Sequence, residues 1–119
     1  MNAIIIAAGS GKRISNKIRN TPKALIEINN KTIIQYQIDA LKKMNIDKII
    51  VITGPNYEKF NLKDVQYIND KNYEKHDILG SLIEARDYIK NDVLILYSDI
   101  IFEPKIIGDV LDSKSDISI

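Results

Sequence analysis

The sequence predicts an α/β protein built as a three-layer α/β/α fold with a mostly parallel sheet. Residues 3–8 form a continuous apolar run, and the segment 48–53 contains a second one at residues 49–52; both are rich in Ile and too short for helices. Between them, residues 32–44 carry apolar side chains at helical spacing, and a similar order of segments follows toward the C-terminus. Alternating strands and helices of this kind favour right-handed crossovers with helices covering both faces of a sheet.

The first half of the chain predicts a strand, a helix and a second strand. Residues 3–8 end at Gly9 and are typical of a strand buried on both faces. The helix over residues 32–44 has Thr32 in position to cap its first turn. Residues 48–53 repeat the buried-strand pattern, and Gly54-Pro55 then reads as a turn that ends it.

The second half predicts two more strands and two more helices. Residues 65–68 form a short strand, 78–89 a helix capped by Asp77, and 93–97 a fourth strand. Pro104 suits the first turn of a last helix over residues 104–111, followed by a loop. The expected apolar stripe of the helix over residues 78–89 consists of Leu79, Leu82, Ile83 and Ile89.

The last residues, 116–119, alternate between polar and apolar like the start of a strand that is cut short, with a frayed terminus as the alternative. An unpaired edge at that strand would favour a homo-oligomer.

Composition is that of one globular domain, which we expect to span residues 1–119. The chain has 119 residues, of which 45% are hydrophobic, and no cysteine, which excludes disulfides and thiolate metal sites. No apolar run approaches the roughly 20 residues of a membrane span. We therefore expect no membrane partner and a cytoplasmic location.

Charge is distributed unevenly. The formal net charge is +1, but residues 1–26 hold five basic side chains and no acid, so that 12 basic and 16 acidic residues remain for the rest. An anionic ligand near the first loop explains this distribution, and a solvated basic face is the alternative. The five cations are Lys12, Arg13, Lys17, Arg19 and Lys23.

The loop after the first strand, residues 7–13, reads Ala-Ala-Gly-Ser-Gly-Lys-Arg. It lies at the carboxyl end of a buried strand, where open α/β sheets bind ligands, and its glycines let backbone N–H groups face a phosphate. Arg13 stands where a P-loop requires Ser or Thr, and Ile14 stands where a dinucleotide fingerprint requires glycine. Both motifs are excluded, while a purely structural tight turn remains possible.

The segment Thr-Pro-Lys-Ala-Leu at residues 21–25 follows this loop and precedes the amphipathic helix. Together the two motifs resemble the NTP-transferase family of nucleotidyltransferases, which includes sugar-1-phosphate nucleotidyltransferases and phosphocholine-type cytidylyltransferases. The resemblance covers the whole chain and implies a Rossmann-like fold of the nucleotide-diphospho-sugar transferase type. It also implies that the chain is the N-terminal, nucleotide-binding half of such an enzyme.

The resemblance implies roles for the glycine loop and for the lysine after proline. Arg13 contacts the leaving phosphates, and Lys23 contacts the reacting phosphate or that of the acceptor. Pro22 stiffens the segment that carries Lys23. An acceptor phosphate is already ionised, so His76 needs no catalytic role and reads as a surface residue. The residues expected to wrap the NTP are Ala8, Gly9, Ser10, Gly11 and Lys12.

Asp99 follows the strand over residues 93–97, at the same sheet edge as the glycine loop. A carboxylate there suits Mg²⁺, which prefers oxygen ligands and bridges phosphate oxygens. The resemblance implies this metal role for Asp99, and a turn carboxylate is the alternative. Relatives supply a further metal-binding acid from a second half that this chain does not contain.

The region between residues 67 and 86 resembles the part of relatives that contacts base and ribose. Asn69, Gly80 and Ser81 are the candidates there. The Asn-containing form, with Asp77-Ile78 before Ser81, is more similar to the phosphocholine and phosphonate cytidylyltransferases than to the sugar branch. This difference favours CTP over UTP as the donor.

The functional expectation is a Mg²⁺-dependent nucleotidyltransferase. It would transfer an NMP from an NTP to a small phosphorylated acceptor, such as a phosphocholine-like compound, a phosphonate or a sugar phosphate, and release pyrophosphate. One alternative is a nucleotide-binding module without activity. Another is a nucleic-acid-binding domain that uses residues 12–23 as a basic arm, which the lack of interleaved aromatic residues disfavours.

Overall fold

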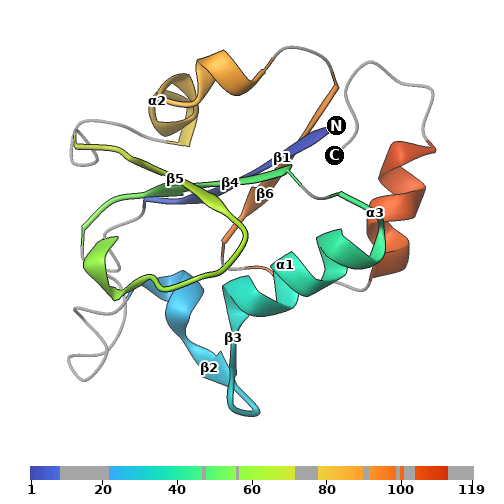
Figure 1. The fold of residues 1–119 in the computed structure, drawn as a ribbon, viewed down its shortest axis with the longest axis horizontal. Coiled ribbons are helices and arrows are strands. Elements are labelled where there is room, and N and C mark those ends of the chain that lie inside the picture. The colour runs from blue at the N-terminus through green and yellow to red at the C-terminus, as the bar shows by residue number, and fades with distance from the viewer. Residues whose placement is uncertain are drawn as a thin grey trace.

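Four parallel strands form the central sheet of the computed structural model, which describes residues 1–8, 22–46, 48–55, 57–71, 78–89, 92–98, 100 and 104–112. The strand order is β5-β4-β1-β6 (Figure 1). The strands are β1 (Asn2–Ala7), β4 (Lys48–Thr53), β5 (Gln66–Asn69) and β6 (Val93–Tyr97). Parallel neighbours need crossover connections, so the predicted α/β class is confirmed.

Helices cover both faces of this sheet, as predicted. Helix α1 (Ile33–Lys43) and helix α3 (Pro104–Leu111) lie on one side, and helix α2 (Ile78–Ile83) lies on the other (Figure 1). Alternate residues of β1 divide between the two layers because successive side chains of a strand point to opposite faces. Ile5 packs in the cluster that contains Ile38 of α1, whereas Ile4 packs in the cluster that Leu82 of α2 joins.

Helix α1 begins and ends at residues suited to those positions. The Thr32 hydroxyl accepts a hydrogen bond of 3.3 Å from the Gln35 N–H, which confirms the predicted cap. At the other end Asn45 adopts a left-handed φ of 61°, and the Ile46 N–H donates to the Leu41 carbonyl at 3.0 Å. This pattern closes the last turn of the helix.

A short hairpin precedes α1 and was not predicted. Strands β2 (Glu27–Ile28) and β3 (Lys31–Thr32) pair antiparallel across Asn29 and Asn30, whose φ angles are 54° and 66°. Two consecutive left-handed residues make a type I′ turn, and asparagine tolerates this conformation well. The Asn-Asn pair is therefore a sequence signal for this hairpin.

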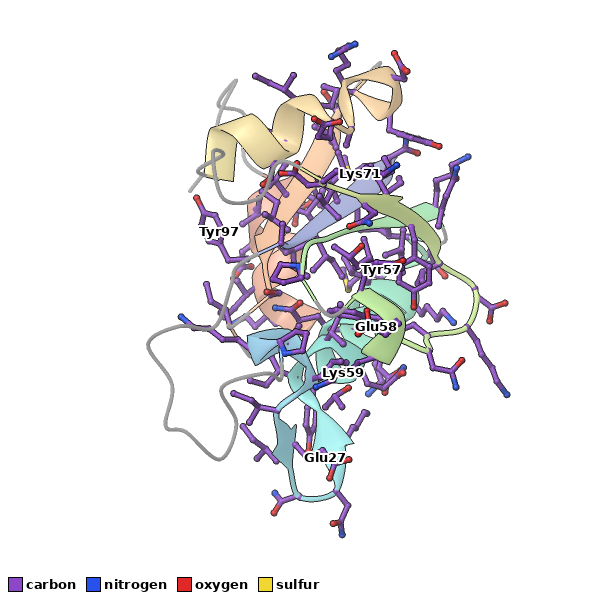
Figure 2. All side chains as sticks on the ribbon, turned by 90° about the vertical axis from the view of Figure 1, so that its left-hand side faces the viewer. Glu27, Tyr57, Glu58, Lys59, Lys71 and Tyr97 are labelled. Carbon is purple, nitrogen blue, oxygen red and sulfur yellow. The ribbon has the colours of Figure 1, made fainter. Side chains whose placement is uncertain are left out.

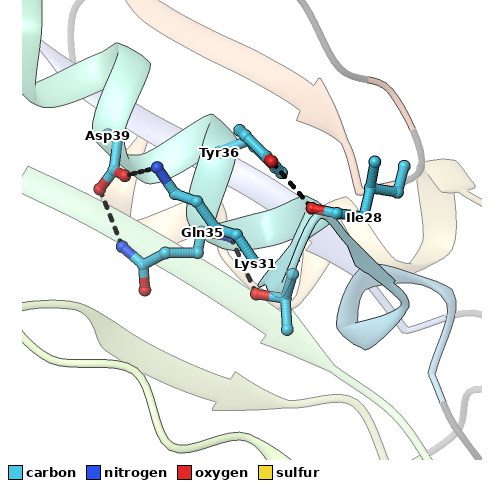
Figure 3. A network of polar contacts seen from close by, with 6 residues as sticks. Ile28, Lys31, Gln35, Tyr36 and Asp39 are labelled. Carbon is cyan, nitrogen blue, oxygen red and sulfur yellow. Dashed lines mark hydrogen bonds and ion pairs between the residues drawn. The ribbon is translucent and has the colours of Figure 1, made fainter.

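Polar contacts tie the hairpin to α1 (Figure 3). The Tyr36 hydroxyl donates to the Ile28 carbonyl at 2.8 Å, and Lys31 forms an ion pair with Asp39. Gln35 Nε2 donates to Asp39 Oδ1 at 2.9 Å. Burial by itself raises the pKa of Asp39, but the hydrogen bond from Lys31, the hydrogen bond from Gln35 and the lysine charge outweigh it. The net result is a pKa below the usual value.

The helix predicted over residues 78–89 is shorter than expected. Helix α2 ends at Ile83, a turn follows, and a 3₁₀ helix, η4, spans Arg86–Tyr88. Ala85 is completely buried and its N–H donates to the Leu82 carbonyl at 3.0 Å, while the Tyr88 carbonyl accepts from Asn2 Nδ2 at 2.9 Å. Packing on the sheet thus overrides the helical pattern. Two members of the expected stripe, Ile83 and Ile89, are exposed instead.

The other predicted elements agree with the structure to within a residue or two. The strands over residues 48–53 and 93–97 and the helix over 104–111 have the predicted bounds, and Pro104 opens α3. Two further 3₁₀ helices, η2 (Lys23–Leu25) and η3 (Tyr57–Lys59), lie in connections. The partial strand predicted at residues 116–119 lies outside the described residues. Within the described ranges no helix is long and apolar enough to cross a membrane.

Candidate functional site

The carboxyl ends of the strands lie at one edge of the sheet. Ala7 of β1 is in register with Thr53 of β4, which is in register with Asn69 of β5. Beyond the last strand residues, the Ser98 N–H donates to the Ile6 carbonyl at 3.2 Å. This edge is on the left in Figure 1, opposite the N-terminal start of β1, and Figure 2 looks onto it.

Ala8, the first expected nucleotide-binding residue, is buried at this edge against Gly54. A Cβ atom added to Gly54 would lie 2.4 Å from the carbonyl oxygen of Ala8 and 2.9 Å from its carbonyl carbon. No side chain fits there, so the two main chains touch where β1 leads into the glycine loop. From the sequence alone, Gly54 is predicted only as part of a turn. A glycine directly after a buried strand was the available signal.

Asp70, which is not among the residues predicted from the sequence, brings Asn69 and Ser81 to the same part of the edge. Asp70 is fully buried, and its N–H donates to the Thr53 carbonyl at 2.7 Å. The Ser81 hydroxyl, itself 4% exposed, donates to Asp70 Oδ2 at 2.8 Å. Asp70 therefore connects the end of β5 to the first turns of α2, which also contain Gly80. Polar groups that are buried in pairs hold their geometry closely.

Lys23 opens the 3₁₀ helix η2, which packs against α1. Pro22 is buried and extended, with a φ of −54° and a ψ of 139°, and its carbonyl accepts from the Leu25 N–H at 2.9 Å. Ala24 is 1% exposed in the cluster under α1. These contacts hold the backbone of Lys23, while its side chain is partly exposed. The stiff segment expected from Pro22 agrees with this arrangement.

Several expected site residues lie outside the described part of the chain, and their roles stay predictions. They are Gly9, Ser10, Gly11, Lys12, Arg13 and Asp99, and the same holds for His76. Among the residues that the structure describes, no group of three or more His, Cys, Asp or Glu side chains could hold a metal ion.

Comparison with known sequences agrees with the family that the motifs resemble. Residues 3–117 match the MobA-like NTP transferase domain. The CTP:phosphoglutamine cytidylyltransferase of Campylobacter jejuni is 34% identical over 131 residues, which cover 100% of this chain and 51% of that protein. The choline-phosphate cytidylyltransferase of Streptococcus pneumoniae is 52% identical over 54 residues, which cover 45% of this chain and 24% of that protein.

Solved structures agree as well. The CTP:phosphocholine cytidylyltransferase LicC from Streptococcus pneumoniae superposes with a TM-score of 0.77 at 34% sequence identity, over 87% of this chain and 49% of that one. The inositol-1-phosphate CTP transferase from T. maritima has the same TM-score of 0.77 at 17% identity, over 97% and 49% of the two chains, which shows the shared fold alone.

The chain spans about half the length of the Campylobacter jejuni enzyme and of LicC, which it matches over most of its own length. Those relatives are nucleotidyltransferases, and the match to the family covers nearly every residue of this chain. The expected Rossmann-like fold and the expected family are thereby confirmed. The chain belongs to the MobA-like NTP transferase family.

Proposed function

We propose that residues 1–119 form the nucleotide-binding half of a cytidylyltransferase, which transfers CMP from CTP to a small phosphorylated acceptor and releases pyrophosphate. The observation that carries this proposal is the edge where Ala8 meets Gly54 and the buried pair of Asp70 and Ser81 lies beside Asn69. Open parallel sheets bind ligands at this edge. The relatives whose names include CTP support the choice of base.

The reaction requires two anions to meet. An acceptor phosphate oxygen attacks the α-phosphorus of CTP in line, a new P–O bond forms, and the bond from the α-phosphorus to the bridging oxygen of pyrophosphate breaks. Both reactants are already ionised near neutral pH, so catalysis consists mainly of positioning and charge neutralisation. The glycine loop after Ala8 would hold the phosphates through backbone N–H groups. Arg13 and Lys23 would neutralise the charge of the leaving and reacting phosphates.

A carboxylate from Asp99 at this edge would suit Mg²⁺, which prefers oxygen ligands. Magnesium is usually held by one or two carboxylates together with substrate phosphates and water, so that a protein need not enclose it. Asp99 would supply a carboxylate directly after Ser98, whose N–H donates to the Ile6 carbonyl of β1. When bound, the ion would neutralise charge on the phosphate oxygens. A second acid would come from the part of the enzyme that lies beyond this chain.

Asn69, Gly80 and Ser81 would contact the base and ribose. Ser81 is engaged with Asp70, so its place relative to β5 is set before a nucleotide binds. Asn69 is half-buried and is the last residue of β5. A base read by hydrogen bonds requires groups that are held in place in this way.

A nucleotide-binding module without activity is the second candidate. The chain spans about half the length of the two cytidylyltransferases that it matches over most of its own length, and acceptor contacts would come largely from the remaining half of such enzymes. This candidate predicts nucleotide binding without product. The cytoplasmic location and self-association expected from the sequence stay predictions, and size-exclusion chromatography tests the latter.

Calorimetric titration of CTP, UTP, ATP and GTP, with and without Mg²⁺, tests the proposal. We expect selective CTP binding that Mg²⁺ strengthens. Lys23→Ala should weaken it roughly tenfold or more, because contacts to charged groups contribute about 1.5–3 kcal/mol. Where turnover is measurable in the full-length enzyme, the same variant should lose about 3 kcal/mol of transition-state stabilisation.

Lys43→Ala provides the matched control. Lys43 is an exposed lysine in the last turn of α1. Its loss should leave CTP affinity unchanged within about twofold, since an isolated exposed charge contributes little. Equal affinity for all four nucleotides would refute the choice of CTP. Equal losses in both lysine variants would show that Lys23 acts only through general charge.

A further inference from the structure

Gln37 is a polar side chain in the apolar layer between α1 and the sheet. It is 1% exposed on the buried face of α1, between Ile34 and Ile38, which belong to the hydrophobic cluster. A buried amide is unfavourable unless hydrogen bonds replace those it made to water. Its partners therefore indicate what the residue does in the fold.

The Gln37 amide holds the backbone just beyond the last residues of β6. Its Nε2 donates to the Tyr97 carbonyl at 2.6 Å and to the Ile100 carbonyl, also at 2.6 Å. A side-chain amide nitrogen carries two N–H groups, so both of its donors are engaged. The two acceptors are three positions apart in the chain, one on each side of Ser98 and Asp99. The amide thus bridges the segment that leaves the sheet.

A second contact fixes the start of this segment from the side of β1. Tyr97 is in register with Ile6, and the Ser98 N–H donates to the Ile6 carbonyl at 3.2 Å. The chain leaving β6 is therefore bonded to β1 through Ser98 and to α1 through Gln37. Ile6 lies two residues before Ala8, so these bonds relate the end of β6 to the entrance of the glycine loop.

The amide oxygen of Gln37 indicates that the two N–H bonds set the orientation of the side chain. Within the described residues, Gln37 Oε1 is buried and has no hydrogen-bond donor. An apolar side chain of similar size would fill the same space without burying an unsatisfied oxygen. The N–H groups are thus the only polar atoms of the Gln37 side chain with hydrogen-bond partners among the described residues, and both donate to carbonyls at the end of β6.

We propose that Gln37 is a positioning residue, which holds the backbone on either side of Asp99 through the carbonyls of Tyr97 and Ile100 and thereby supports the metal role of Asp99. This inference rests on the proposed function, in which Asp99 is a ligand of Mg²⁺. Residues that orient a metal ligand from outside typically change metal affinity 10- to 100-fold when they are mutated. Gln37 would act on the metal and leave direct contacts to the nucleotide in place.

Gln37→Met tests this role, because methionine has a similar length and volume and no N–H donor. Thermal unfolding first establishes that the variant folds. We then expect CTP affinity without metal to stay within about twofold of the wild type. The apparent affinity for Mn²⁺ in the presence of CTP, followed by electron paramagnetic resonance, should fall roughly tenfold. Gln35→Met, two residues away on the partly exposed face of α1, is the control and should change neither quantity.

Gln37→Asn is the second variant if methionine is not tolerated. It keeps both N–H groups, but its side chain is one methylene shorter, so the amide nitrogen would lie too far from the carbonyls of Tyr97 and Ile100. The same loss of Mn²⁺ affinity is therefore expected. Combination with Asp99→Asn separates a role through Asp99 from a general one. In that background Gln37→Met should cause no further loss.

Each outcome is decisive. A folded Gln37→Met variant with wild-type Mn²⁺ affinity, or a full additional loss in the Asp99→Asn background, would overturn the inference while leaving the proposed function intact. CTP binding by the wild type that no divalent ion strengthens would instead refute the metal role of Asp99. The inference about Gln37 would then fall with that part of the proposed function.

Discussion

Replacement of Gly54 by alanine tests the contact between the two main chains at the sheet edge. The φ of Gly54 lies outside the left-handed region, so an alanine backbone can adopt the same conformation and the effect is steric. The added Cβ would lie 2.4 Å from the Ala8 carbonyl oxygen, whereas real Cβ contacts are essentially never below 3.0 Å. The difference, 3.0 minus 2.4, means that one main chain must move by at least 0.6 Å.

That movement is costly because both partners are backbone. Ala7 and Thr53, the residues before Ala8 and Gly54, are paired in the ladder between β1 and β4. Overpacking of a closely packed interior typically costs about 1–3 kcal/mol. For a chain of this size we expect a melting temperature lower by roughly 5–15 °C. Urea unfolding and thermal unfolding of the same preparations measure both quantities.

Gly108→Ala is the control for this experiment. The added Cβ on α3 would lie 3.2 Å from Met44 Cε, the far end of a flexible side chain that can move aside. Alanine is also favoured over glycine within a helix by about 1 kcal/mol. We expect this variant to be as stable as the wild type or slightly more stable. If Gly54→Ala unfolds at the wild-type urea concentration, the close approach of Ala8 and Gly54 does not exist in solution.

Two further predictions concern a buried hydrogen bond and a surface ion pair. Ser81→Ala removes the donor to the buried Asp70 and should lower the free energy of unfolding in urea by about 1–3 kcal/mol, so a change below about 0.5 kcal/mol would contradict the pairing. Asp39 has a lowered pKa through Lys31 and Gln35, so its stabilisation is present above the unfolded pKa and is lost as pH falls through the folded value. Asp39→Asn should therefore reduce the loss of stability below about pH 4, by less than about 1 kcal/mol because the pair is partly exposed. If the wild type and Asp39→Asn lose the same free energy of unfolding between about pH 7 and pH 3, the prediction is contradicted.

Buried strands were the most predictable part of the fold. Residues 49–52 carry buried apolar side chains on both faces of the central strand β4, and this pattern is compatible with few other structures. The end of α2 was not predictable in the same way. Ala85 and Tyr88 pack on the sheet through tight turns, although the sequence pattern continues as a helix. The spacing of apolar residues does not indicate which tertiary contacts form when the chain adopts another conformation after Ile83.

The hairpin before α1 shows a different reason for a missed element. Asn29 and Asn30 favour the left-handed conformations of a type I′ turn, but its two strands are only two residues long. Alternation over so few residues is too short to indicate a strand. Contacts to α1, such as the one from Tyr36 to Ile28, supply the stabilisation that the short ladder lacks.

The sequence by itself determined the fold class and the family, and it predicted a phosphate-binding loop with Lys23 on a stiff segment after it. Those conclusions depend on residues that are close together in the chain, where glycine, proline and apolar spacing act locally. Only the tertiary structure decided that the main chain of Gly54 touches that of Ala8, and that Asp70 accepts a hydrogen bond from Ser81. The same is true of the two hydrogen bonds from Gln37 to the backbone at the end of β6. Each of these contacts joins residues at least 11 positions apart. Their geometry follows from strand register and helix packing, which exist only once the chain has folded.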